Sequence, residues 1–514
     1  MRTTFLSLPL LIWLALLVMM LVRFAIMFGT GPLHDEAYYW SWSQELDFGY
    51  YDQPFLTGWL LAPFVALLGD GAWVMRAVAT LLIFAATAFL ALTVNALSGP
   101  PKAQNAQQEL QGQKGRSGVE GSGSAALSGF LLLAFTSPVL WSVGLFYVHD
   151  TVMVCFLSLG LWLGVEALKR DKGLSSRPWW IMAGLALALA FSAKVSAALW
   201  IMALGLSVAV HPQSRPHLRA AGPWLGAGLP LAAFLLFLTW NALNGWVTFR
   251  HVGGEHLVPD TSTPASDRFL RFGLVVLATP LFSGLTAIVL VVLGAVRRFR
   301  ALLHNPGVFA LVVFTLLPLL IFFGLSGLRD VYLNWLIPSC LGLLVLSCCL
   351  WIGPIRRWHV ITSLPSAMLA LALLLPIAFR QPWFMPSNAR DMLGWEASIE
   401  KLMEYRDVAY PGYEIVGNYY HLAAQTSFHQ GTVRPSVGLD PRPHQFNLYH
   451  WPDDKARAPL LVLTPSLDEG MEALSGVFCS VTPLSPWPVN HREGRIALPY
   501  LFAIHNPSEK PDCG

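Results

Sequence analysis

The chain has 514 residues, of which 55% are hydrophobic and only 12% are charged, with a net charge of +3. A soluble protein carries about 25% charged residues, so this composition excludes a soluble single domain, and it excludes disorder because so much apolar surface must be buried. The small, dispersed positive charge also argues against nucleic-acid binding, and the apolar excess indicates a bilayer protein.

A helix needs roughly 20 apolar residues to cross the hydrocarbon core of a bilayer. About eleven stretches qualify: 6–28, 72–97, 127–147, 150–168, 179–194, 196–210, 223–241, 272–296, 307–326, 332–350 and 361–379. The region 179–210 is too long for one span and short for two, so we expect a tight turn at Lys194. Residues 1–379 are therefore predicted to form an all-α, polytopic membrane domain.

Basic residues predict the orientation, because Lys and Arg accumulate in cytoplasmic loops. With the N-terminus inside, the inner segments carry 15 Lys and Arg residues and the short outer segments carry 5. An odd number of spans then places residues 380–514 in the periplasm. This tail mixes Pro, Gly, aromatic and charged residues and contains strand-like runs such as 460–463. We expect a small α/β domain there.

Two further features concern the loops. The inner segment 98–126 is rich in Gly, Ser and Gln, which is typical of a flexible linker. Cys479 and Cys513 lie in the polar tail and could pair in an oxidising compartment. The sequence leaves that pairing open.

The first outer loop, 29–71, is the most informative stretch. It contains no Lys or Arg but holds six carboxylates: Asp35, Glu36, Glu45, Asp47, Asp52 and Asp70. They must be solvated or find cations in other loops. The loop is also rich in Tyr and Trp, so an aromatic interfacial helix with solvated acids is the plain alternative to a site.

Asp35 and Glu36 follow the first span directly. Neighbouring side chains on a helix point about 100° apart, so one can face a cavity while the other braces it. A single carboxylate suits a displacement in which a base takes the proton of the acceptor. A phosphate leaving group departs as an anion and needs no second acid.

Other polar residues recur at the predicted outer ends of spans. They are Arg76, His149, Asp150, Lys194, Arg329 and, in the loop 242–271, Arg250 and His251. A charge at the bilayer centre costs at least ~2.5 kcal/mol, whereas at the rim water recovers most of that cost. Each residue alone is explained equally well as a snorkelling anchor. Together they favour an outward-facing pocket lined by acids and bases.

These motifs resemble a known family. The run 34–60, HDEAYYWSWSQELDFGYYDQPFLTGWL, is similar to the first outer loop of bacterial polyprenyl-phosphate-dependent membrane glycosyltransferases. Those enzymes are relatives of dolichyl-phosphate-mannose protein mannosyltransferases and lipid A aminoarabinose transferases and have the GT-C fold. Further resemblances follow in WVMRAVATLL (73–82), LFYVHDTVMV (145–154), GLALALAFSAKVSAAL (184–199), LRDVYLNWLIP (328–338) and GW (394–395). The resemblance covers roughly residues 1–430.

The resemblance implies roles for individual residues. Asp35 would be the catalytic carboxylate, and Glu36 would brace the site. Asp52 lies where relatives place an acidic residue in the pocket, in some cases near a metal. A divalent metal is therefore a candidate cofactor, with Asp52 as its candidate ligand. Arg76, Lys194 and Arg329 would neutralise the donor phosphate or pair with the acids, and Asp150 matches the family's junction aspartate.

The chain departs from the family pattern at three positions. Gln53 stands where relatives usually have a basic residue, and Phe55 stands where they have a second proline. His149 precedes Asp150 instead of the more common proline. Because Gln53 cannot neutralise a phosphate, we expect Arg250, His251 or Lys194 to take that role.

The sequence thus predicts a glycosyltransferase of the bacterial inner membrane. It would move a sugar from a polyprenyl-phosphate carrier to a lipid, glycan or protein acceptor on the periplasmic face, with inversion. The main alternative is a transporter or flippase for a lipid-linked or small polar substrate, which would predict inverted halves or helices broken near the midplane. A non-catalytic membrane subunit is a third option.

Overall fold

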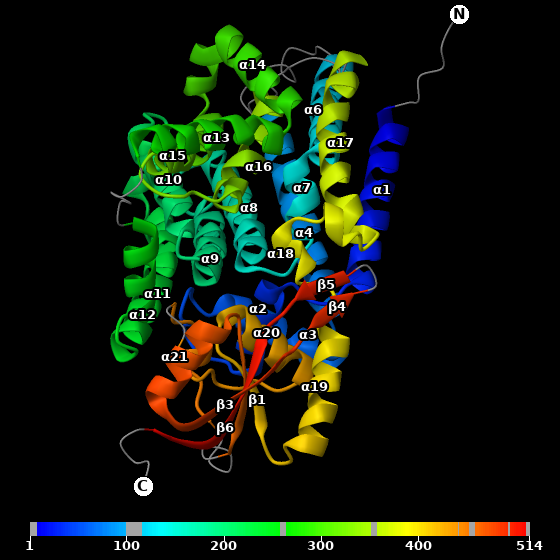
Figure 1. Cartoon of the computed structure of the whole chain (residues 1–514). Helices are drawn as coiled ribbons and strands as arrows, with labels where there is room; N and C mark the ends of the chain where they lie inside the picture. The colour runs from blue at the N-terminus through cyan, green and yellow to red at the C-terminus, as the bar shows by residue number, and fades with distance from the viewer. Residues whose placement is uncertain are drawn as a thin grey trace, which may run out of the picture. The chain divides into compact units, whose positions relative to one another are not determined.

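The computed structural model describes residues 8–98, 116–257, 264–350, 357–439, 442–451, 458–491 and 494–509. The chain divides into two compact units (Figure 1). Unit 1 comprises Met1–Leu21, Ala79–Leu145 and His149–Ala372. Unit 2 comprises Val22–Val78, Phe146–Val148 and Leu373–Gly514. The first outer loop and the C-terminal region therefore belong to the same unit, which sequence separation did not predict.

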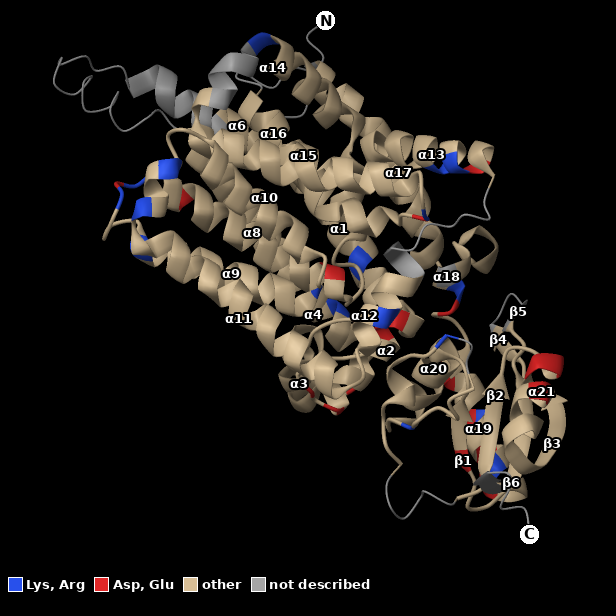
Figure 2. Cartoon of the chain, turned by 90° about the vertical axis from the view of Figure 1, so that its left-hand side faces the viewer, with Lys and Arg blue, Asp and Glu red and all other residues tan. Residues whose placement is uncertain are grey.

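Unit 1 is built from apolar helices. Their bounds are α6 (Arg116–Thr136), α7 (Pro138–Ser142), α8 (His149–Leu168), α9 (Arg177–Ala193), α10 (Ala197–Val210), η1 (Arg215–Arg219), α11 (Ala221–Leu243), α12 (Val247–His251), η2 (Val252–Leu257), α13 (Ala265–Ser283), α14 (Leu285–His304), α15 (Pro306–Ser326), η3 (Leu333–Leu336) and α16 (Ile337–Leu350). Helices α1 (Leu8–Gly29), α4 (Ala72–Ser98) and α17 (Arg357–Ala378) contribute to both units. Figure 2 shows long stretches of α10, α11 and α15 without charged residues, as burial in a bilayer requires.

The number of full-length spans is smaller than predicted. Seven helices within the described residues are long and apolar enough to cross a membrane, and an eighth span is formed if the bent pair α13 and α14 counts as one. Helices α3 (Leu56–Leu68), α9 and α10 and the segment Ala125–Thr136 are apolar but shorter. The chain is therefore a mostly helical, multi-span protein, and each of the eleven predicted stretches contains helix.

Three sequence predictions need correction. The span predicted at 272–296 is two helices that meet at 97°, because Gly284 adopts a φ of +99° between them. The span predicted at 127–147 is interrupted after Thr136, where Ser137 is extended before Pro138. The linker predicted at 98–126 ends earlier, since α6 begins at Arg116. Its segment 99–115 lies outside the described residues.

The tight turn predicted at Lys194 is confirmed. Helix α9 ends at Ala193, Lys194 is extended with a φ of −153°, and α10 begins at Ala197. Helix α9 then packs closely on α11, because a Cβ atom at Gly184 would overlap the carbonyl oxygen of Gly226. Small residues allow two backbones to approach in this way.

Unit 2 combines two helices of the first outer loop with the C-terminal region. The loop contributes α2 (His34–Gln44) and α3. The C-terminal helices are η4 (Pro382–Phe384), α18 (Ser387–Arg390), α19 (Trp395–Ala409), α20 (Tyr420–Gln430), η5 (Gln445–Asn447) and α21 (Leu467–Val477). The strands are β1 (Glu414–Gly417), β2 (Leu460–Thr464), β3 (Phe478–Pro486), β4 (Val489–His491), β5 (Gly494–Ala497) and β6 (Tyr500–Glu509). Helix α2 packs against α3 and α20.

The C-terminal sheet is mixed, as the expectation of an α/β region implied. Its strand order is β1-β2-β6-β3, with β1 and β2 parallel and the other pairs antiparallel. Side chains alternate between two faces. Leu461 and Leu463 pack with α19 residues on one face, whereas Leu460 and Val462 pack with Leu474 of α21 on the other. Strands β4 and β5 form a separate hairpin.

Cys479, at the start of β3, is disulfide-bonded. Cys513, which the sequence suggested as its partner, lies outside the described residues. Cys155, Cys340, Cys348 and Cys349 are free cysteines in apolar helices. They therefore behave as small core residues.

Candidate active site

The first turn of α2 separates the two adjacent acids. The side chain of Asp35 is 41% exposed, whereas Glu36 is fully buried. Glu36 reaches back to the start of its own helix, where its Oε2 accepts the backbone N–H of Leu33 at 3.0 Å. A carboxylate at this position favours the helix N-terminus because it satisfies an otherwise unpaired N–H group. One acid is thus accessible and its neighbour is structural, as the 100° offset on a helix predicted.

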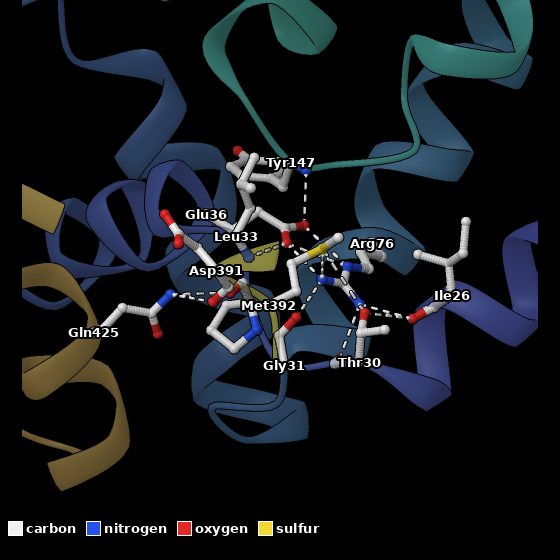
Figure 3. Close-up of polar contacts among 11 residues, drawn as sticks. Ile26, Thr30, Gly31, Leu33, Glu36, Arg76, Tyr147, Asp391, Met392 and Gln425 are labelled. Atoms are coloured by element: carbon white, nitrogen blue, oxygen red, sulfur yellow. Dashed lines mark hydrogen bonds and ion pairs between the residues drawn. The ribbon is translucent and has the colours of Figure 1, made fainter. Parts of the chain in front are cut away.

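Glu36 is held by Arg76 from the first turns of α4 (Figure 3). Nη2 of Arg76 lies 2.8 Å from Oε2 of Glu36, and Nε lies 3.2 Å from both carboxylate oxygens. The backbone N–H of Tyr147 donates to Oε1 at 3.2 Å. Both partners are at most 1% exposed. A buried ion pair is tolerated only when its remaining donors and acceptors are satisfied, and these contacts satisfy them.

The remaining donors of Arg76 bind the end of α1. Nη1 donates to the carbonyl oxygen of Ile26 at 2.8 Å and to Thr30, whose backbone and side-chain oxygens lie at 3.1 and 2.8 Å. Nη2 also donates to the carbonyl oxygen of Gly31 at 2.6 Å. A guanidinium has five N–H donors, and these contacts use all of them. In this arrangement Arg76 has no donor left for a phosphate, and its contacts favour a role in holding the loop.

Asp35 lies beside a histidine that a second carboxylate holds. Nδ1 of His34 is 3.0 Å from Oδ2 of Asp391, and Nε2 of His34 is 3.7 Å from Oδ1 of Asp35. Burial of the imidazole lowers its pKa, but the hydrogen bond to Asp391 and the charges of Asp35 and Asp391 together raise the pKa of His34 above 6.5. Asp391 follows α18, outside every motif that the sequence analysis used.

Asp52 and Gln53 lie in the same unit. Burial raises the pKa of the Tyr38 hydroxyl, and the charge of Asp52 and a hydrogen bond to it raise it further. That hydroxyl also accepts the backbone N–H of Gln445 at 3.0 Å. Gln53 is 9% exposed, and its carbonyl oxygen accepts the N–H of Tyr50.

Asp52 was also the candidate metal ligand. A protein site for a divalent cation needs several oxygen or nitrogen ligands. Within the described residues, no three His, Cys, Asp or Glu side chains are grouped so that they could hold a metal ion. The donor set around Asp52 therefore does not fit a metal site built from the described side chains.

Unit 1 holds a second polar cluster, centred on Asp150 at the start of α8. Nζ of Lys194 lies 2.6 Å from Oδ1 of Asp150, and Nδ2 of Asn334 donates to Oδ2 at 3.0 Å. His149 is 3.4 Å from the same carboxylate. Asp150 and Lys194 are 3% and 5% exposed. Asn334 was not among the predicted site residues, although it lies in the LNW segment that carried the family resemblance.

The remaining predicted site residues lie elsewhere in unit 1. Arg329 donates from Nη2 to the carbonyl oxygen of Gly254 at 2.9 Å. Arg250 is exposed on α12, and the neighbouring His251 is 7% exposed. Among the described residues, the partners of the Asp150 carboxylate are Lys194, Asn334 and His149. Of the three residues that the sequence suggested for the donor phosphate in place of Gln53, namely Arg250, His251 and Lys194, this cluster contains Lys194, which is paired with Asp150.

Comparison with known proteins agrees with these features. Residues 121–240, just under a quarter of the chain, match the model of the dolichyl-phosphate-mannose-protein mannosyltransferase family. A lipid A galacturonosyltransferase, RgtD of Rhizobium johnstonii, is 25% identical over 227 residues, which are 43% of this chain and 41% of that protein. The match thus spans about two-fifths of the length of this curated relative.

Two crystal structures of ArnT from Cupriavidus metallidurans match over 95% of this chain and 97% of theirs. The apo form has a TM-score of 0.57 at 13% identity, and the form bound to undecaprenyl phosphate has a TM-score of 0.58 at 14% identity. The chain has the ArnT fold. Its resemblance to the polyprenyl-phosphate-dependent membrane glycosyltransferases is confirmed, and with this fold it is a multi-pass integral membrane protein.

Proposed function

We propose that this ArnT-like protein is a glycosyltransferase that moves a sugar from a polyprenyl-phosphate carrier to an acceptor outside the cytoplasm, with Asp35 as the general base. The proposal rests on the difference between the two adjacent acids of α2. Asp35 is accessible, and within the described part of the chain no Arg or Lys pairs with it, whereas Glu36 is buried and paired with Arg76. An accessible carboxylate held at the start of a rigid helix is suited to proton abstraction.

The reaction balances with one base. Asp35 takes the proton of the acceptor hydroxyl or amine while the acceptor atom bonds to the anomeric carbon. The bond between that carbon and the phosphate oxygen breaks, and polyprenyl phosphate leaves with the electron pair. Attack from the side opposite the phosphate inverts the anomeric centre. Fixed cations that face the departing phosphate lower the barrier because its charge grows in the transition state.

Lys194 is the cation that we propose for the phosphate. Its ammonium group has three N–H donors, and Asp150 accepts from it at 2.6 Å. The other two donors can serve an anion, whereas Arg76 has used all five of its own. Arg250, His251, Arg329, Asp52 and Gln53 remain secondary candidates for contacts with the substrates.

We also propose about eleven membrane crossings, a cytoplasmic N-terminus and a periplasmic C-terminal domain at the bacterial inner membrane. The seven or eight full-length spans would be completed by α9, α10 and the shorter apolar segment Ala125–Thr136. The proposed boundary at 379 and 380 falls just after α17, which ends at Ala378. The excess of basic residues on the inner side supports this orientation. The disulfide bond of Cys479 supports it independently, because disulfides persist in oxidising compartments such as the periplasm.

The first acceptor to test is a lipid A-like glycolipid, because the relative RgtD is described as a lipid A galacturonosyltransferase. Purified protein in lipid nanodiscs would be incubated with this acceptor and a panel of polyprenyl-phosphate sugars. The assay follows release of polyprenyl phosphate and labelling of the acceptor. A transporter would move the lipid without breaking the sugar–phosphate bond, so the absence of release with every donor would contradict the proposal.

The residue-level test is Asp35→Asn, which keeps the shape of the side chain and removes the base. Loss of a general base lowers the rate by about 10²–10⁴-fold. The matched control is Asp47→Asn, the same change in the same loop at an exposed side chain, and we expect it to retain activity. Full activity of a folded Asp35→Asn protein would refute the assignment of the base.

A further inference from the structure

His34 lies between two carboxylates from distant parts of the chain. Its Nδ1 is 3.0 Å from Asp391, and its Nε2 is 3.7 Å from Asp35. The first distance is a hydrogen bond, and the second brings opposite charges together without one. The imidazole is 12% exposed, and the ring of Tyr420 packs edge-on against it with centroids 5.4 Å apart. Three neighbours therefore restrict the orientation of the ring.

The segment that carries Asp391 is held against Gly31 and Pro32, the residues that precede α2 (Figure 3). Nε2 of Gln425 donates to the carbonyl oxygens of both Pro32 and Asp391, at 3.1 and 3.2 Å. The N–H of Gly31 donates to the carbonyl oxygen of Met392 at 3.0 Å. The amide of Gln425 is nearly inaccessible to water at 1% exposure, so these bonds face little competition. The C-terminal region thus holds the backbone at Gly31 and Pro32, directly before the first turn of α2.

This arrangement determines what Asp35 faces. Because Asp391 accepts from Nδ1, the opposite ring nitrogen points to Asp35 whether or not the ring is charged. Among the residues that the structure describes, the charged and titratable groups that face His34 are Asp35 from its own helix, Asp391 from the segment after α18, and Tyr420 from α20. Burial and the nearby carboxylates raise the pKa of Tyr420 well above its usual range, so its hydroxyl remains neutral. Two carboxylates and one neutral phenol favour the imidazolium form.

We propose that Asp391 and His34 are positioning residues for Asp35, with Asp391 holding the imidazole as a cation that orients the Asp35 carboxylate before the acceptor binds. The proposal rests on the proposed function, in which Asp35 is the base. It makes the C-terminal region a part of the catalytic apparatus. Gln425 and Met392 contribute by fixing the backbone that carries Asp391.

The test compares Asp391→Asn with Asp391→Glu and His34→Gln. Asparagine keeps the backbone carbonyl that binds Gln425 and removes the charge that acts on His34. The control is Asp407→Asn, the same change at an exposed carboxylate of α19 that pairs with Arg406. Polyprenyl phosphate release would be measured from about pH 5.5 to about pH 8.5, the range in which histidine titrates, with kcat and the donor KM determined at each pH.

We expect Asp391→Asn to lower kcat by about tenfold or more while the donor KM changes by less than about twofold, because the base is affected and binding is not. Its alkaline limb should move to lower pH, since the imidazole loses the carboxylate that favours its charged form. The pH profile of the His34→Gln protein should lack the alkaline limb. Asp391→Glu should recover part of kcat, and Asp407→Asn should match the unmodified protein.

Two outcomes would overturn the inference and leave the proposed function intact. One is an inactive Asp35→Asn protein together with unchanged kcat and pH profiles in both Asp391→Asn and His34→Gln. The other is a loss of activity in Asp391→Asn that is matched by its loss of folded protein, while folded His34→Gln keeps the normal pH profile. Full activity of Asp35→Asn would instead refute the proposed function.

Discussion

The buried pair of Glu36 and Arg76 gives a sharp prediction for Arg76→Lys. The substitution keeps the positive charge, so it separates the effect of charge from the effect of hydrogen-bond geometry. Arg76 serves six oxygens: the carbonyls of Ile26, Thr30 and Gly31, the hydroxyl of Thr30 and both carboxylate oxygens of Glu36. A lysine ammonium has three donors at a single atom.

The expected loss of stability follows from the number of hydrogen bonds that the substitution removes. At least three of the six oxygens lose the hydrogen bond from residue 76, and water cannot replace it because Arg76 is 1% and Glu36 0% exposed. The carbonyl oxygen of Ile26 still accepts the hydroxyl of Thr30. The Glu36 oxygens still accept the N–H groups of Leu33 and Tyr147, so each loss is that of one hydrogen bond among several. At about 0.5–1.5 kcal/mol for each lost hydrogen bond, the folded protein should lose about 2–4 kcal/mol.

The assay is thermal unfolding of the detergent-solubilised protein, followed by intrinsic fluorescence. For a large protein each kcal/mol lowers Tm by about 2–4 °C, so we expect a fall on the order of 10 °C. The control is Arg406→Lys, because Arg406 pairs with the exposed Asp407 and such surface pairs contribute about 0–1 kcal/mol. Equal Tm values for the two variants would refute the reasoning that geometry, beyond charge, stabilises the pair.

Two further predictions concern packing and pH. Gly226→Ala should lower Tm markedly, because a Cβ atom at Gly226 would overlap the carbonyl oxygen of Trp180. The control is Gly228→Ala on the same helix, where a Cβ atom meets nothing within 4 Å and should be tolerated. Equal Tm values for the two variants would contradict the close contact at Gly226. Burial lowers the pKa of His429 from 6.5 to about 4, so the unfolded chain takes up a proton that the folded chain refuses as the pH falls from about 6.5. This should cost up to about 3 kcal/mol by pH 4, and Tm curves against pH that run parallel for the unmodified protein and His429→Gln would exclude it.

The helices could be predicted because hydropathy follows directly from composition. Every predicted stretch contains helix, and the turn at Lys194 is where the length of the apolar run required it. The points at which a helix bends or is interrupted could not be predicted in the same way. Two apolar runs are interrupted at Gly284 and before Pro138, and hydropathy does not locate these points because a bend depends on backbone conformation, which a hydropathy average does not contain.

The arrangement of the candidate site could be predicted where its residues lie in one motif. Asp35 and Glu36 are adjacent, and helix geometry separates their side chains. Their partners could not be predicted from spacing, since Arg76 is 40 residues from Glu36 and Asp391 is 357 residues from His34. Asn334 had a signal in its family segment, whereas Asp391 had none beyond its nearness to the GW pair at 394–395.

The discontinuous composition of unit 2 has a consequence for biosynthesis. Residues 22–78 leave the ribosome early, and their hydrogen-bond partners at 391, 392 and 425 are made hundreds of residues later. The first turn of α2 must therefore remain without these restraints during most of translation, and contacts between such distant residues form late in folding. A nascent chain that stops after α17 would have its membrane helices but would lack the hydrogen bonds that the C-terminal region makes to the residues before α2, so the proposed site around Asp35 would be completed only after the C-terminal region has folded.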